Sequence, residues 1–292
     1  MDVFIIGGTG YLGSVIVEKL IASGHTVTAL ARSERSAEQL RAAGARPLSG
    51  NIDDTDVLRA AAGSADAVVY AASDYAATEE SMRAELDAVA AVVAGASSKP
   101  VIYTSTGLVY GFDPTDVSED AELPAVSAQP VKGQAEQIVL SATNGVVIRA
   151  GLIFGRGGTG LVTGLIAAAA QNGAASYIGE GSNSWYPIHV DDLVDLYLRA
   201  IEHPVPGIFN AVGTVPFTLK ELADAIGDLT GTPSVSIPLE VAQAQMGPAV
   251  RTLTTSSRLV ATKAREAYGW QPRERSLIED VRSGSYTVAS VE

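Results

Sequence analysis

Four glycines stand close together near the start of the chain, in the run Gly7-Gly8-Thr9-Gly10-Tyr11-Leu12-Gly13. Residues 3–6 before this run are apolar, which predicts a strand buried on both faces of a parallel sheet. The apolar residues after it recur at helical spacing. Glycines in such a turn let the backbone approach a pyrophosphate, and the helix N-terminus offers free N–H groups. The pattern predicts a dinucleotide-binding turn; a glycine-rich surface turn is the alternative.

The next strand is predicted at residues 26–30. The residues that follow its end indicate whether the chain binds NAD or NADP. In dinucleotide-binding folds an acidic residue here holds the ribose hydroxyls of NAD, whereas a basic residue accommodates the 2′-phosphate of NADP. This chain has Arg32 and Ser33, with Arg35 close behind, and no acid at the end of the strand itself. A guanidinium can pair with a phosphate, and a serine hydroxyl can donate to it. The sequence therefore favours NADP(H), unless these arginines are merely solvated residues at a helix start.

Composition narrows the classes of partner. The 292 residues carry a formal net charge of −13, and a basic surface for nucleic acid or anionic membrane is therefore not expected. The chain has no cysteine, which excludes thiolate catalysis and cysteine-bound metals, and its three histidines lie far apart, so we predict no metal site. No long apolar run indicates a membrane span or signal peptide. We expect a cytoplasmic protein with a small-molecule substrate, as a monomer or homodimer.

The elements that must position these residues alternate between strand and helix. Strands are predicted at residues 46–48, 66–71, 100–105, 146–149 and 207–212, and helices at 33–43 and 76–94. The helix over 76–94 is expected to bury the face that carries Met82, Leu86, Val89 and Val93. The alternation predicts an α/β fold with a doubly wound parallel sheet.

The last third of the chain predicts further elements, and two of them carry explicit end signals. Helices are expected at residues 159–171, from His189 to about 202, 238–246, 257–268 and 276–283, and a strand at 235–237. Thr218, with Glu221 three residues later, matches the capping box of a helix that runs to about residue 230.

Three stretches resemble one known family. The glycine run, the segment 103–111 with its Thr106 and Val-Tyr-Gly ending, and the segment 187–192 (PIHVDD) are similar to the extended short-chain dehydrogenases/reductases, the NAD-dependent epimerase/dehydratase relatives. The resemblance implies a Rossmann domain with a smaller C-terminal substrate-binding lobe. It implies an NADP(H)-binding domain at 1–155, to which 185–215 return, and a substrate-binding lobe at 156–184 and 216–292.

The resemblance also implies which residues surround the cofactor. Asn51 takes the place of an aspartate whose side chain lies at the adenine, and Ile52 would lie against the base. The full set of implied cofactor-binding residues is Gly7, Thr9, Gly10, Tyr11, Leu12, Gly13, Arg32, Ser33, Asn51, Ile52, Ala71, Ala72, Ser73 and Lys132.

The family's catalytic pair is Tyr-x-x-x-Lys, and this chain keeps only half of it. Lys132 matches the lysine, but the position four residues earlier is Ala128. Thr106 matches the family residue that hydrogen-bonds the reacting oxygen. A lysine without the tyrosine resembles atypical relatives that reduce benzylic ethers and isoflavones. The proton donor must then lie elsewhere: Tyr75 is our first candidate, Tyr186 the second, and Lys132 itself a third.

The expected substrate is small and rather apolar. Trp185 stands where sugar-nucleotide enzymes of this family carry an arginine for the diphosphate, and Tyr186 follows it. With Tyr75 and Thr106 these aromatic residues would form the substrate site. The sequence thus predicts an NADPH-dependent oxidoreductase that transfers hydride to a carbonyl or conjugated double bond. Two alternatives remain: a cofactor-recycling epimerase, dehydratase or cyclase, and a non-catalytic NADP(H)-binding redox sensor.

Overall fold

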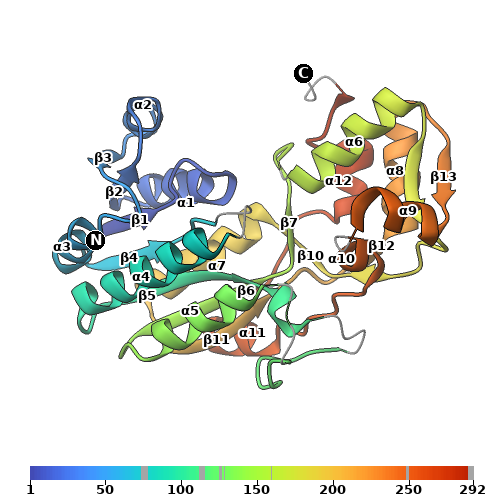
Figure 1. Ribbon diagram of the computed structural model, residues 1–292. Coiled ribbons are helices and arrows are strands. Elements are labelled where there is room, and N and C mark those ends of the chain that lie inside the picture. The colour runs from blue at the N-terminus through green and yellow to red at the C-terminus, as the bar shows by residue number, and fades with distance from the viewer. Residues whose placement is uncertain are drawn as a thin grey trace.

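The computed structural model describes residues 1–73, 78–111, 116–124, 127, 129–158, 160–247 and 250–288. Its centre is a parallel sheet of seven strands in the order β11-β6-β5-β4-β1-β2-β3 (Figure 1). The strands are β1 (Asp2–Ile6), β2 (Thr26–Ala31), β3 (Arg46–Ser49), β4 (Ala67–Tyr70), β5 (Val101–Thr106), β6 (Gly145–Ala150) and β11 (Gly207–Ala211). The doubly wound α/β fold predicted from the alternating pattern is confirmed.

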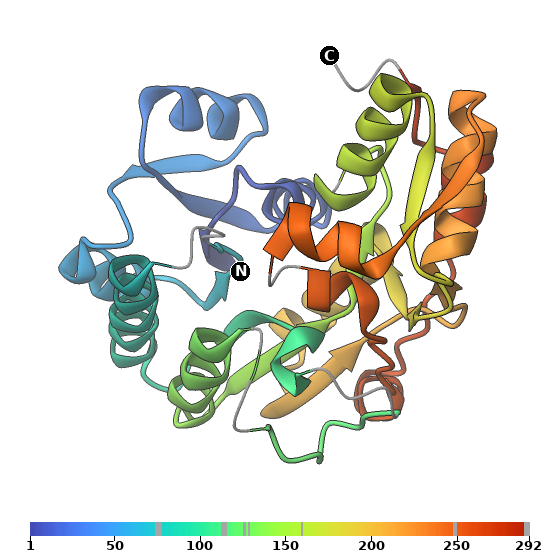
Figure 2. The same cartoon turned by 45° about the vertical axis from the view of Figure 1, so that its right-hand side comes forward.

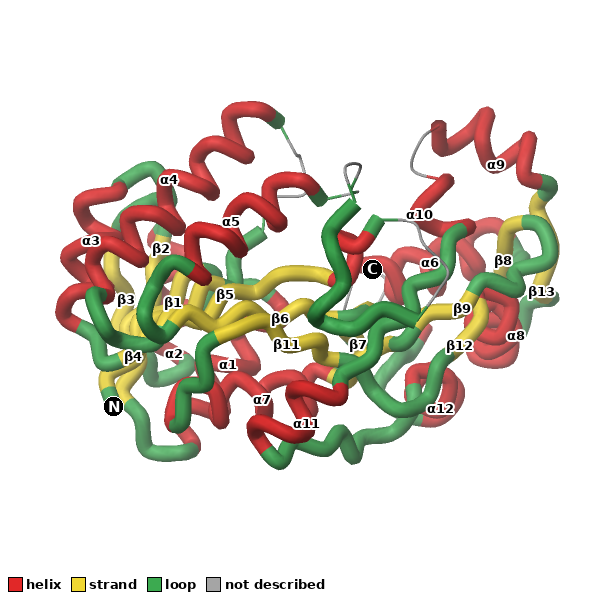
Figure 3. Tube along the Cα trace, turned by 90° about the horizontal axis from the view of Figure 1, so that it is seen from below, coloured by secondary structure: helices red, strands yellow, loops and turns green. Residues whose placement is uncertain are grey.

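Helices cover both faces of this sheet (Figure 3). One face packs against α3 (Thr55–Ser64), α4 (Glu79–Ala96) and α5 (Pro130–Leu140). The other packs against α1 (Tyr11–Ala22), α2 (Glu34–Ala42), α7 (Val190–Glu202) and α11 (Thr262–Tyr268). Because both faces are covered, the central strands read as continuous apolar runs.

The glycine run forms the turn between β1 and α1. Gly7 has a φ of +93°, and a Cβ there would lie 2.7 Å from the backbone of Ala71 and Ala72 at the end of β4. A Cβ at Gly13 would lie 2.0 Å from the carbonyl oxygen of Gly7. Side chains at these two positions would force β1, β4 and α1 apart, so the glycines are required for this close approach.

A smaller lobe follows the carboxyl ends of the strands and has its own apolar core (Figures 1 and 2). Its helices are α6 (Gly160–Asn172), α8 (Leu219–Thr230), α9 (Leu239–Met246), α10 (Val250–Thr254) and α12 (Leu277–Ser283). Three two-stranded sheets complete it: β7 (Leu152–Phe154) with β10 (Pro187–His189), β9 (Ser184–Trp185) with β12 (Phe217–Thr218), and β8 (Ala175–Ile178) with β13 (Ser234–Ile237). A short 3-10 helix, η1 (Gly107–Tyr110), follows β5.

Two predictions about helices need correction and one is confirmed. The helix expected over 257–268 begins only at Thr262, because residues before it make single bridges, Ser257 to Trp185 and Leu259 to Val117. That helix, α11, packs against β11 and α7. The capping box of α8 is confirmed, since Thr218 and Glu221 each accept the other's backbone N–H.

The buried face of α4 also differs from the prediction. Val89 is buried, but Met82, Leu86 and Val93 are only half-buried. The line of fully buried side chains runs one position earlier, through Glu85, Ala88, Val92 and Ala96. The apolar pattern excluded Glu85 because a carboxylate is rarely placed in a core unless it is paired.

Among the described residues, none of the helices combines the length and the apolar character needed to cross a membrane.

Candidate active site

Thr106 lies at the carboxyl end of β5, the edge of a parallel sheet at which such folds bind ligands. It is paired in register with Ala150, the last residue of β6. Its Oγ1 accepts a hydrogen bond of 3.2 Å from the backbone N–H of Leu108 and so caps η1. Because the oxygen acts there as acceptor, the hydroxyl hydrogen is left for another partner. The structure therefore places Thr106 where the sequence predicts it, with a donor to offer.

Lys132 lies in the first turn of α5 and reaches back to α4. Its ammonium nitrogen is 2.7 Å from Oε1 of Glu85, and each of the two residues is only 5% exposed. The same oxygen accepts a 2.5 Å hydrogen bond from the hydroxyl of Tyr103 on β5. The Lys132 nitrogen also stands 5.1 Å from the centroid of the Tyr103 ring. One buried carboxylate thus binds both the lysine and the tyrosine.

The buried tyrosines beside this pair are poor proton donors. Burial, and then the negative charge of Glu85, raise the pKa of Tyr103 far above its usual range. The same two causes raise the pKa of Tyr70, whose ring centroid is 5.6 Å from that of Tyr103. The hydroxyl hydrogen of Tyr103 is in addition already donated to Glu85. Neither residue can therefore replace the tyrosine that the family uses.

A second buried ion pair lies one helical turn further along α5. Glu136 is fully buried and accepts two hydrogen bonds from Arg149 on β6, of 3.0 Å from Nε and 2.6 Å from Nη2. Ser105 donates to the same carboxylate. The guanidinium of Arg149 lies over the ring of Tyr110, 4.6 Å from its centroid. This fork-to-fork geometry is typical of a pair that ties a helix to a strand.

The cofactor end of the site contains an arginine without a partner. Arg32 follows the last residue of β2 and is exposed, and no residue that the structure describes forms a hydrogen bond or ion pair with it. The hydroxyl of Ser33 accepts the backbone N–H of Ser36 at 3.2 Å and so caps α2. A phosphate on the ribose would be met here by a free guanidinium at the start of a helix.

Two loops, one after β3 and one after β4, contain further residues that the resemblance assigns to the cofactor. Asn51 is exposed, and its amide is engaged locally, donating to Asp53 and accepting from the N–H of Ile52. Ala71 and Ala72 follow β4 and directly face Gly7. Ser73 is exposed and next to them. Adenine binding by Asn51 would require its amide to exchange partners.

Trp185 and Tyr186 differ in what they can offer a substrate. Trp185 is 7% exposed, its indole N–H donates to the carbonyl of Thr255 at 2.7 Å, and its ring packs on Phe217. Tyr186 is half-buried, and its hydroxyl has no hydrogen bond to any described residue. Its backbone lies against Gly151, which directly follows the register partner of Thr106. The structure thus brings Tyr186 to the carboxyl edge of the sheet.

Tyr75, the first candidate for proton donor, lies outside the described residues, as does Ala128, the position of the missing tyrosine. Sequence reasoning passed over Glu85 and Tyr103, which the structure adds to the site. The sequence signal for Glu85 was its helical spacing from Ala88 and Val92. This spacing puts the carboxylate on the same buried face of the helix as two apolar side chains.

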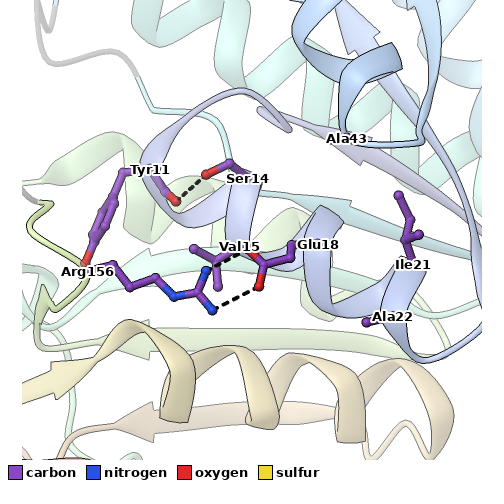
Figure 4. A pocket seen from close by; sticks show the side chains of 8 residues that line it. All are labelled: Tyr11, Ser14, Val15, Glu18, Ile21, Ala22, Ala43 and Arg156. Atoms are coloured by element: carbon purple, nitrogen blue, oxygen red, sulfur yellow. Dashed lines mark hydrogen bonds and ion pairs between the residues drawn. The ribbon is translucent and has the colours of Figure 1, made fainter.

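A surface cavity of about 630 Å³ lies along α1 (Figure 4), and neither Thr106 nor Lys132 lines it. It is lined by Tyr11, Ser14, Val15, Glu18, Ile21, Ala22, Ala43 and Arg156. At one end Arg156 binds Glu18 at 2.7 Å and, outside the cavity, Asp191 at 2.6 Å. Tyr11 donates to the carbonyl of Gly155 at 2.7 Å. These contacts tie α1 to the segment that leads into the smaller lobe.

Comparison with known proteins decides the family. Residues 3–211 match the NAD dependent epimerase/dehydratase family. The chain belongs to this family. Of its relatives, an uncharacterized protein of Schizosaccharomyces pombe is 29% identical, over 98% of this chain and 100% of its own length. A 4-hydroxy-2-methyl-3-oxo-4-farnesyl-3,4-dihydroquinoline-1-oxide ketoreductase of Stigmatella aurantiaca is 29% identical, over 84% of this chain and 78% of its own.

A solved structure of the same fold contains UDP-glucose and NAD. MoeE5 in complex with UDP-glucose and NAD superposes with a TM-score of 0.80 at 20% identity, covering 98% of this chain and 97% of that one. At this identity the likeness establishes the fold alone.

Proposed function

We propose that this family member is an NADPH-dependent reductase that transfers hydride to a carbonyl or conjugated double bond of a small, rather apolar substrate. Membership of a nucleotide-cofactor family supports the cofactor, and the quinoline-oxide ketoreductase relative supports the reaction. When bound, NADPH supplies the hydride; a proton from the protein or from water completes the reduction. We expect the reaction in the cytoplasm.

The observation that carries the choice of NADPH is the free guanidinium of Arg32. It follows β2 with no acid beside it, and no described residue neutralises its charge. A 2′-phosphate would pair with it, and the ribose hydroxyls of NAD would find no carboxylate there. The close approach of β1, β4 and α1 at Gly7 and Gly13 leaves backbone, not side chains, to face a pyrophosphate.

The substrate end requires a donor for the oxygen that gains negative charge. Thr106, at the end of β5, has a hydroxyl hydrogen to donate. Lys132, in the first turn of α5, provides a positive charge. The proton donor is then Tyr75 or Tyr186, in that order of preference, and Tyr186 has an uncommitted hydroxyl. Trp185 and Tyr186 would give the pocket its aromatic wall.

Two other functions each have one observation in their favour. Membership of an epimerase/dehydratase family favours a reaction in which the cofactor is reduced and reoxidised on one substrate. Alanine in place of the acid–base tyrosine favours a redox sensor that binds NADP(H) without turnover. Turnover of NADPH with net oxidation of the cofactor would exclude both.

The test is a titration of the purified protein with NADPH and with NADH, followed by NADPH oxidation with ketones, enones and imines. We expect NADPH to bind tightly, and Arg32→Ala to raise its Kd about ten-fold while leaving the Kd of NADH nearly unchanged. Arg35→Ala is the matched control, because it removes the same charge three residues away. Equal losses for both cofactors in Arg32→Ala would contradict the phosphate role.

A further inference from the structure

The buried carboxylate of Glu85 has no place in the proposed reaction so far, yet it is the direct partner of Lys132. Its Oε1 accepts from both Lys132 and Tyr103. The pair joins α4 to the first turn of α5, and the tyrosine joins both to β5. Burying a carboxylate and an ammonium costs free energy that a structural contact between two helices does not require. Apolar side chains would join the helices equally well.

Among the described residues, the Lys132 ammonium uses only part of its capacity to donate hydrogen bonds. An ammonium has three hydrogens to donate, and among the described residues one of them goes to Glu85. Lysine carries its charge on a flexible chain of four carbons, so the direction of the remaining hydrogens depends on what fixes the first. Here the fixed point is Oε1 of Glu85, and the Tyr103 ring at 5.1 Å limits the other side.

We propose that Glu85 is a positioning residue for the cofactor. It holds the Lys132 ammonium at one oxygen, so that the remaining hydrogens of the ammonium can donate to the hydroxyls of the cofactor's ribose. Tyr103 fixes Glu85 in turn, through its hydroxyl. This inference rests on the proposed function, since it requires a dinucleotide bound beside Lys132.

The charges around the pair make this role sensitive to the loss of Glu85. The groups that face it are Tyr103 from β5, Tyr70 from β4 and, one turn along α5, Glu136. Both tyrosines stay neutral, and Glu136 is already bound to Arg149. Without Glu85, no described group would balance the Lys132 ammonium, and burial favours the neutral form of an unpaired lysine.

The experiment measures the Kd of NADPH by titration calorimetry, for the wild type and for Glu85→Gln. The amide keeps the shape and an acceptor oxygen but removes the charge. We expect Kd to rise about ten-fold or more near pH 8. Asp87→Asn is the control, since it removes one exposed charge from the same helix and should leave Kd unchanged.

A purely structural role for Glu85 would give a different result. Glu85→Gln would then unfold at a lower temperature but bind NADPH with wild-type affinity, which overturns the proposal. If Glu85→Gln does not fold, Tyr103→Phe tests the same chain of contacts, with an expected rise in Kd of about three-fold; no change would count against the proposal. Failure of the wild type to bind either NADPH or NADH would overturn the proposed function as well.

Discussion

Two buried ion pairs start one turn apart on α5, and they differ in how completely they are satisfied. Glu136 and Arg149 meet through two parallel hydrogen bonds, with Ser105 as a third donor and Tyr110 stacked on the guanidinium. Lys132 and Glu85 meet through a single oxygen, which Tyr103 shares. No described residue donates to the second oxygen of Glu85, and two hydrogens of Lys132 are unused among the described residues. In the first pair both oxygens of the carboxylate are bound, while Nη1 of Arg149 is buried with no hydrogen bond to a described residue. In the second pair only one oxygen of the carboxylate is bound among the described residues, so its carboxylate and ammonium are open to another partner.

The difference indicates what each pair is for. A pair that meets through two parallel hydrogen bonds, with both carboxylate oxygens bound, gains these bonds on folding and so acts on the fold. An open pair keeps donors that only a ligand can satisfy, and a buried, partly satisfied network is costly to the protein alone. We infer that the Arg149 pair holds β6 to α5 and that the Lys132 pair serves the cofactor.

The largest effect is expected from Arg149→Met. It leaves the Glu136 carboxylate buried with Ser105 as its remaining donor, which should cost about 3–5 kcal/mol of unfolding free energy. Urea denaturation measures this loss. The folded fraction should bind NADPH with wild-type affinity. A loss of affinity without a loss of stability would erase the distinction between the two pairs.

Lys132→Met should lower the affinity for NADPH as well as the stability, because it too leaves a buried carboxylate with a single donor, Tyr103. It removes the donor proposed for the ribose, and we expect the Kd of NADPH to rise by about 10–100-fold, as for the loss of hydrogen bonds from a charged group. Titration calorimetry gives the Kd, and urea denaturation of the same sample shows how much stability is lost beside it. If affinity were unchanged, Lys132 would be no more than a structural residue like Arg149.

The smallest effect on stability is expected at a third cluster of ion pairs, in which Arg156 binds Glu18 and Asp191 at the surface. Hydrogen bonds from Arg156 lower the pKa of Glu18, and they lower that of Asp191 although burial alone would raise it. Carboxylates with a lowered pKa stabilise the fold above their unfolded pKa and lose that contribution as pH falls through the folded value. Arg156→Ala should therefore lower the melting temperature slightly at pH 7 and less at pH 3. A larger effect at pH 3 would contradict this account.

Sequence reasoning succeeded where local signals and burial agree. The glycine run, the apolar strands and the capping box at Thr218 and Glu221 all specify their elements locally. It failed for residues 257–261, which form isolated bridges to Val117 and Trp185 that only tertiary contact determines. It also missed Glu85, because its partner Lys132 is on another helix, 47 residues further along the chain. Periodicity alone cannot show that a carboxylate in a helix has a buried partner.

The most direct test of the central claim is the affinity of the variant Lys132→Met/Glu85→Leu/Tyr103→Phe for NADPH. Replacing a whole buried pair by apolar side chains of similar size is often neutral for stability. Because Glu85→Leu also removes the acceptor of the buried Tyr103 hydroxyl, Tyr103→Phe is included, and the combined variant should fold about as stably as the wild type. We predict that it binds NADPH at least about ten-fold more weakly. Wild-type affinity in this folded variant would show that the open pair does not serve the cofactor.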